Sequence, residues 1–183
     1  MSDSYFDAAG FLEVDLNNGC IRSRADDQLA LVPWDVLATL NGNELLGAVA
    51  HAWGERHAKQ LTAQSGGDLT TIDLSAISDH LGGTLATLGM GTLSVVIHGN
   101  ALLFKAVARE SSAPGYAKLL SGFIKGYLHI LSPHEFAVPV LETTDAHVIL
   151  FAGNANAAQT LQSYIGQGLS PLAAVERLNR EVH

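Results

Sequence analysis

Residues 92–108 have the sequence TLSVVIHGNALLFKAVA, which predicts two strands joined by a tight turn. The first arm, residues 92–98, alternates in polarity and is rich in β-branched side chains, as strands are. Gly99 and Asn100 separate it from the second arm. Glycine at the first position of a two-residue turn suits a type II′ hairpin, because glycine reaches positive φ without steric cost. The segment therefore predicts an antiparallel β-hairpin.

Helical patterns lie on both sides of this hairpin. Upstream, residues 34–61 and 74–88 carry apolar side chains at three- and four-residue spacing. Downstream, residues 115–131 form one apolar helical face, and Gly122 and Gly126 lie four positions apart within it. Each glycine inside a helix costs about 1 kcal/mol relative to alanine. We therefore expect another element to pack closely against the helix at these glycines.

The remaining segments are an N-terminal hairpin, a second strand pair and two helices, at residues 11–24, 135–142 with 147–152, 155–165 and 171–182. Pro139 limits the strand that contains it to a sheet edge or a bulge. Strands so close along the chain pair antiparallel, because parallel strands need long crossovers. The expected fold class is α+β: an antiparallel sheet of about four strands, plus the N-terminal hairpin, packed with helices.

Length and composition favour one domain. The 183 residues fit a single domain, which we divide into a hairpin extension (1–32), a core (33–153) and a C-terminal helical extension (154–183). Hydrophobic residues make up 48% of the chain and charged residues 15%, against about 25% charged in an average protein. This composition excludes disorder and predicts that some apolar surface is covered either by self-association, as a dimer or larger oligomer, or by a ligand, with self-association favoured.

The charge distribution excludes several classes of partner. The net charge is −8 and no run of Lys or Arg forms a basic stripe, so we expect no binding to nucleic acid or to anionic membranes. No apolar run reaches the ~20 residues that span a bilayer, so no membrane insertion is expected. The N-terminus has no signal-peptide pattern, and the single Cys20 cannot form an intrachain disulfide. We expect a cytoplasmic protein.

No motif of a catalytic site stands out. The chain has no Gly-x-Ser-x-Gly motif, and no base is placed near its one cysteine. His129, His134 and Glu135 could form a metal site in principle, but histidines at a helix end are favoured there by the helix dipole alone. His80 is expected on a helix surface. We therefore expect a binding protein rather than an enzyme, with no catalytic residues, metal or cofactor.

Aromatic side chains are the remaining candidates for a site. Five of them could line a pocket between the central helix and the sheet: Trp53, Phe104, Tyr116, Phe123 and Tyr127. A solid core has the same spacing, so a pocket and a core both stay open as interpretations. A tyrosine hydroxyl would give such a pocket a polar contact. An amphipathic face near the C-terminus is a candidate surface for a protein partner: Leu172, Val175, Leu178 and Val182.

Most of the chain resembles the 4-vinyl reductase domain family and related N-terminal sensor domains of aromatic-responsive bacterial regulators. The matching stretches are LVPWDVLATL (31–40), AWGERHAKQL (52–61), LATLGMGTLSVVIHGNALLFKAV (85–107), SGFIKGYLHIL (121–131), FAVPVLE (136–142) and HVILFAG (147–153). The resemblance implies a non-catalytic regulatory domain that binds a small apolar or aromatic molecule and dimerises. Many members carry zinc-binding cysteines. The corresponding stretches APGYAKLL (113–120) and ETTDAHVILF (142–151) contain none, so no zinc site is expected.

A second resemblance is to the accessory protein of bacterial cellulose synthase known as its D subunit. It rests on ISDHLGGTLATLGMGTLSVVI (77–97) and KLLSGFIKGYLHIL (118–131). This resemblance implies the alternative function, a non-enzymatic assembly or scaffold subunit of a larger complex. It leaves the N-terminal hairpin and the C-terminal helices unexplained.

Overall fold

The computed structural model describes residues 44–67, 72–99, 101–108 and 115–181, and the backbone of three short N-terminal strands. In chain order, the elements are β1 (Leu12–Asp15), β2 (Cys20–Ser23), β3 (Gln28–Leu29), α2 (Glu44–Gln64), α3 (Leu74–Thr87), β4 (Thr92–His98), β5 (Ala101–Val107), α4 (Tyr116–Leu131), β6 (Val140–Thr143), β7 (Val148–Ala152), α5 (Ala155–Gly166) and α6 (Pro171–Glu181). The short helical stretch expected from residue 34 to about residue 40 lies outside the described residues. The division of the chain at residues 32 and 153 stays a prediction.

Four antiparallel strands form the main sheet, in the order β4-β5-β7-β6. The predicted central hairpin is confirmed, because β4 pairs with β5 from Thr92 opposite Val107 to His98 opposite Ala101. Gly99 begins the turn with a φ of 62°, a conformation that glycine adopts without strain. The three N-terminal strands form a separate antiparallel sheet, β1-β2-β3. The fold class is α+β, with an antiparallel sheet packed against helices.

The strand that follows Pro139 lies at an edge of the main sheet. Its pairing with β7 shifts register between Val140 and Glu142, which is a β-bulge or similar irregularity. Upstream of β6, the backbone nitrogen of Phe151 donates to the carbonyl oxygen of Pro139 at 3.1 Å. A proline at an edge removes no hydrogen bond from the ladder, because its nitrogen faces away from a neighbouring strand. The prediction of an edge strand with an irregularity is confirmed, but the strand begins at Val140, after Pro139, and not at residue 135 as expected.

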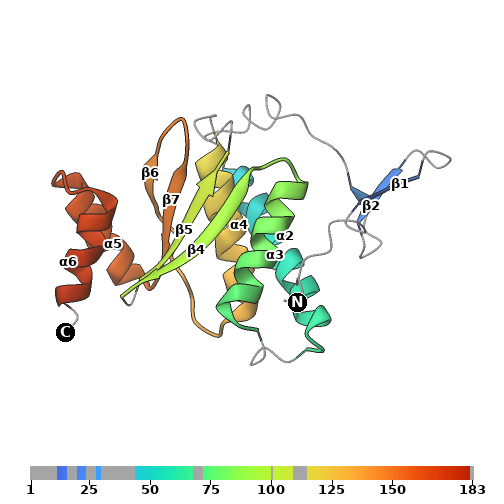
Figure 1. Cartoon of the computed structure of the whole chain (residues 1–183), viewed down its shortest axis with the longest axis horizontal. Coiled ribbons are helices and arrows are strands. Elements are labelled where there is room, and N and C mark those ends of the chain that lie inside the picture. Colours follow the sequence, from blue (N-terminus) through green and yellow to red (C-terminus); the bar gives the residue numbers. More distant parts are fainter. Residues whose placement is uncertain are drawn as a thin grey trace.

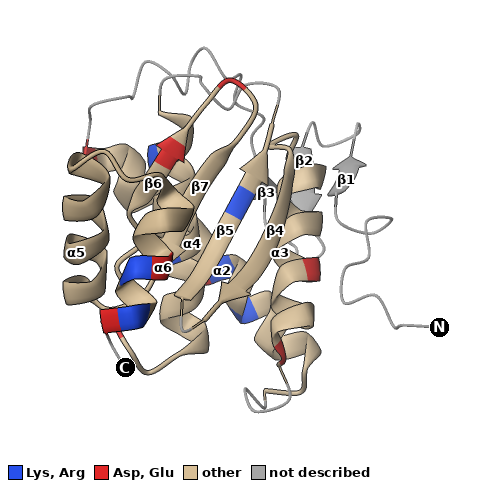
Figure 2. Ribbon diagram, turned by 60° about the vertical axis from the view of Figure 1, so that its left-hand side comes forward, with Lys and Arg blue, Asp and Glu red and all other residues tan. Residues whose placement is uncertain are grey.

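Helices cover both faces of the sheet, with α2, α3 and α4 on one side and α5 and α6 on the other (Figure 1). Successive side chains of a strand point to opposite faces. Phe104 and Leu150 accordingly belong to the larger core with α2, α3 and α4, whereas Leu103 and Phe151 pack in a second core with α5 and α6. Charged residues are few and scattered over the described part of the molecule (Figure 2).

Helices α2 and α4 cross with their backbones in direct contact. A Cβ atom on Gly126 would overlap the carbonyl oxygen of His51, and one on Gly54 would overlap that of Phe123. A Cβ atom on Gly122 would lie 2.8 Å from a backbone oxygen of α2, whereas ordinary contacts begin at 3.4 Å. The close approach predicted from the two glycines of α4 is therefore confirmed.

This contact decides which face of α2 is buried. Apolar spacing favours a face made of Leu45, Leu46, Val49, Trp53 and His57. Leu46 and His57 are buried, but Leu45 and Val49 are 54% and 56% exposed. The full set of buried residues is Leu46, Ala50, Gly54, His57, Ala58 and Leu61. Half of them are glycine or alanine, because only small side chains fit where the α4 backbone approaches so closely.

Candidate functional site

Three ionisable side chains meet inside the larger core, one from each of three helices. His57 of α2 is 5% exposed, His80 of α3 is 2% exposed and Tyr127 of α4 is fully buried. The Tyr127 hydroxyl forms a hydrogen bond with Nδ1 of His80 at 2.9 Å, and the two imidazole rings lie 6.5 Å apart. Such groups are uncommon in an apolar interior, so this cluster is the first candidate for a functional site.

The prediction that His80 lies on a helix surface is wrong. His80 shares a buried stripe of α3 with Ala76 and Thr84, which lie four residues before and after it. Residues four apart occupy one face of a helix, and this face turns toward the core. The small alanine and threonine in the stripe gave no hydrophobic signal strong enough to reveal it.

Aromatic rings surround the two histidines. The Trp53 and Phe123 rings meet edge to face with centroids 5.3 Å apart. Phe123 lies 5.7 Å from the His57 ring, and Tyr127 lies 5.8 Å from the His80 ring. Edge-to-face and tilted pairs at these separations are favourable ring contacts. The cluster therefore combines planar apolar walls with a small number of polar atoms.

Burial keeps this cluster uncharged at neutral pH. Desolvation, with a smaller contribution from nearby His80, lowers the pKa of His57 to about 4. Desolvation also lowers the pKa of His80 to about 4 and raises the pKa of Tyr127. The hydroxyl of Thr84, one turn beyond His80, is buried and has no hydrogen-bond partner among the described residues. The cluster offers neutral donors and acceptors.

The five aromatic residues predicted to line a pocket are all in the larger core, with Trp53 at its margin. Trp53, Phe123 and Tyr127 adjoin the histidines through the ring contacts above. Phe104 enters the core from β5. Tyr116 begins α4, and its hydroxyl donates to the carbonyl oxygen of Met90 at 2.7 Å. A pocket between these side chains stays a prediction, and sequence reasoning missed the two histidines.

No group of three His, Cys, Asp or Glu residues in the described part of the chain is placed to hold a metal ion. The residues considered from the sequence make different contacts. His129 Nε2 lies 3.8 Å from a carboxylate oxygen of Glu55, and Glu135 lies 3.8 Å from Lys125 Nζ. The backbone nitrogen of His134 donates to the hydroxyl of a neighbouring serine.

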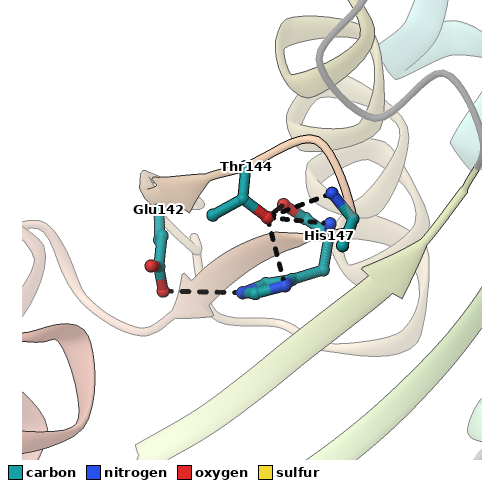
Figure 3. A network of polar contacts seen from close by, with 4 residues as sticks. Glu142, Thr144 and His147 are labelled. Carbon is teal, nitrogen blue, oxygen red and sulfur yellow. Dashed lines mark hydrogen bonds and ion pairs between the residues drawn. The ribbon is translucent and has the colours of Figure 1, made fainter.

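A second polar group surrounds the turn between β6 and β7 (Figure 3). Glu142 Oε2 lies 3.6 Å from His147 Nε2, and Thr144 Oγ1 lies 3.2 Å from His147 Nδ1. This order resembles a carboxylate, imidazole and hydroxyl relay. However, the Thr144 hydroxyl accepts from the backbone nitrogens of Ala146 and His147. Because its lone pairs stabilise the turn, we interpret the group as structural.

The amphipathic face of α6 is largely used within the chain. Val175 and Leu178 are buried in the second core with α5 and the sheet. Leu172 is 53% exposed, and Val182 lies outside the described residues. Binding of a protein partner by this face stays a prediction, with Leu172 as its exposed member.

The chain matches no known family model and no curated protein. Among solved structures, it is similar to the phenol-responsive sensory domain of the transcription activator PoxR, in a crystal structure with phenol. The two share 15% sequence identity with a TM-score of 0.60, over 83% of this chain and 89% of that one. The chain has the fold of that sensory domain. The 4-vinyl reductase and cellulose synthase resemblances stay predictions.

None of the helices in the described part of the chain is long and apolar enough to cross a membrane. The cytoplasmic location stays a prediction.

Proposed function

We propose that this chain is a small-molecule-binding regulatory domain. Its ligand would be a small, neutral, mostly apolar ring that carries a hydroxyl or similar polar group. The observation that carries the proposal is the buried cluster of His57, His80 and Tyr127 among aromatic rings. The fold shared with the PoxR sensory domain, which is described as phenol-responsive, supports it further.

Burying these polar side chains costs free energy of folding, and the fold itself does not require polar side chains at these positions. Burying a polar group costs free energy unless it forms a hydrogen bond, and apolar side chains of similar size would fill the same space. Within the core, Tyr127 and His80 satisfy each other. A ligand hydroxyl inserted beside them would form a hydrogen bond with His80 or with the buried Thr84 hydroxyl, while its ring packs against Phe123 and Trp53.

The same physical argument limits the ligand's charge. Both histidines are neutral at pH 7, because burial lowers their pKa values to about 4. A carboxylate placed beside them would lose its hydration without gaining a cation. We therefore expect phenol and its neutral derivatives to bind, and benzoate to be rejected.

Thermal unfolding of the full chain with phenol, 4-methylphenol, toluene and benzoate tests this function. A ligand at one hundred times its Kd should stabilise the protein by about 2.7 kcal/mol. We expect the two phenols to raise the Tm, toluene to have a smaller effect and benzoate to have none. The Phe123→Ala variant should lose the shift through its loss of ring contact, while the exposed His134→Ala variant should keep it. Equal shifts for toluene and the phenols would contradict the role of the polar cluster.

Self-association is a further proposal of ours, supported by exposed apolar side chains such as Leu45 and Val49 on α2. Native mass spectrometry would measure the oligomeric state and any bound small molecule together. A purely monomeric chain would contradict the proposal. A large, closed and empty oligomer would favour the assembly-subunit alternative over ligand binding.

A further inference from the structure

A surface hollow of about 510 Å³ lies between α2 and α4. Its polar lining residues are His51 of α2 and Lys118, Ser121 and Lys125 of α4, and two glycines and an alanine complete the wall. None of these residues belongs to the aromatic and histidine cluster in the core. The volume falls in the range of small-molecule sites.

The glycines explain why the hollow is open. A Cβ atom on Gly122 would lie 2.8 Å from the carbonyl oxygen of Gly47, so the two backbones touch at this point. A Cβ atom on Gly47 would meet only Cε of Lys118, at 3.8 Å. The helices are therefore in contact without side chains between them, and the space beside the contact is left to the longer residues around it.

The charge of the lining is opposite to that of the chain. The protein has 18 acidic and 10 basic residues, yet the described residues that line the hollow include two lysines and no carboxylate. Lys118 and Lys125 lie seven residues apart, which is about two helical turns, so both project from one side of α4. Their flexible side chains can converge on one ligand.

Among the described residues, two carboxylates lie near the lining without being part of it. Glu55 lies 3.7 Å from His51 Nδ1, and Glu135 lies 3.8 Å from Lys125 Nζ but is largely exposed. An exposed pair such as Lys125 and Glu135 is weak, so an anion could replace Glu135 as the partner. The Ser121 hydroxyl donates to the Val138 carbonyl oxygen. This hydrogen bond links α4 to the segment before β6, so the hydroxyl is not counted as a ligand contact.

We propose that this hollow is a second binding site, which takes a small polyvalent oxyanion of the phosphate type, with Lys118 and Lys125 as its charged contacts. Lysine ammonium groups bind phosphate oxygens as point charges and need no fixed planar geometry. Two of them separated along a helix suit a ligand with more than one charged oxygen centre. The site is separate from the one proposed in the core and takes a ligand of opposite character.

Calorimetric titration of the full chain with pyrophosphate, at constant ionic strength, tests the proposal. The double variant K118Q/K125Q should bind pyrophosphate at least about tenfold more weakly than the original chain. The matched control K59Q/K105Q removes the same charge from exposed lysines outside the hollow, and its affinity should stay within about twofold. Circular dichroism should show that both variants are folded.

Two results would overturn the proposal. One is an original chain that takes up no pyrophosphate, and the other is an equal loss of affinity in both double variants, which would indicate general charge attraction. Stabilisation by phenol should be the same in K118Q/K125Q and in the original chain. The proposed phosphate site and the proposed core site are therefore tested by separate measurements, and either proposal can be refuted without the other.

Discussion

Acidification should destabilise the folded chain through its two buried histidines. In the folded state, burial holds the pKa values of His57 and His80 at about 4, whereas an unfolded histidine titrates at about 6.5. Between these values the unfolded state binds protons that the folded state does not. The free energy of unfolding is therefore at its full value above about pH 6.5 and falls as the pH drops toward 4.

The magnitude follows from the width of this window. One pKa unit corresponds to about 1.4 kcal/mol, so a histidine with the folded pKa given above loses about 3 kcal/mol of stability by pH 4. Two such histidines would remove a large part of the roughly 5–15 kcal/mol that typically stabilises a domain. Acid unfolding should consequently begin while most carboxylates are still ionised.

Urea unfolding followed by tryptophan fluorescence at several pH values between 7.5 and 4.5 measures this loss. The double variant His80→Leu with Tyr127→Phe removes both members of the buried hydrogen bond, so neither is left unsatisfied. It should show about half the pH gradient of the original chain. His134→Leu, which changes an exposed histidine, should leave the gradient unchanged. Identical gradients in all three proteins would refute the assignment of the pH dependence to the core.

Two further substitutions test packing. Gly126→Ala places a methyl group against the His51 carbonyl oxygen and should lower the free energy of unfolding by about 2 kcal/mol or more, measured by urea unfolding. Gly47→Ala, on the facing helix, has room for its methyl group and should stabilise by up to about 1 kcal/mol; a loss of similar size in both would contradict the helix contact. Asn179→Ala removes the hydrogen bond from Nδ2 to the His98 carbonyl oxygen, 2.8 Å long, and should cost about 1 kcal/mol, with an unchanged Tm as the contrary result.

The features predicted correctly from the sequence depend on local chemistry. The central hairpin needs only alternating side chains and Gly99 at its turn, and both are visible within seventeen residues. Pro139 identifies an edge strand because its missing N–H group has the same consequence in any fold. Gly122 and Gly126 indicate a close neighbour, since two costly residues in one helix need a packing reason.

The structural features that the sequence did not reveal depend on which other element each helix packs against. The sequence does not say that α4 approaches α2 at Gly54. Apolar spacing alone therefore places Leu45 and Val49 on the buried face, although both are exposed. His80 was misplaced for a related reason. An imidazole between alanine and threonine carries no hydrophobic signal, and its hydrogen-bond partner Tyr127 lies on another helix.

The contrast between fold and site bears on where function is encoded. A chain with 15% identity to the PoxR sensory domain keeps that fold, because backbone contact between helices and an alternating sheet tolerate many apolar sequences. Fold alone therefore says little about the ligand. The neutral histidines are different, since their burial reduces stability in acid. A costly feature that the fold does not need is the place where we expect selection for ligand chemistry to act.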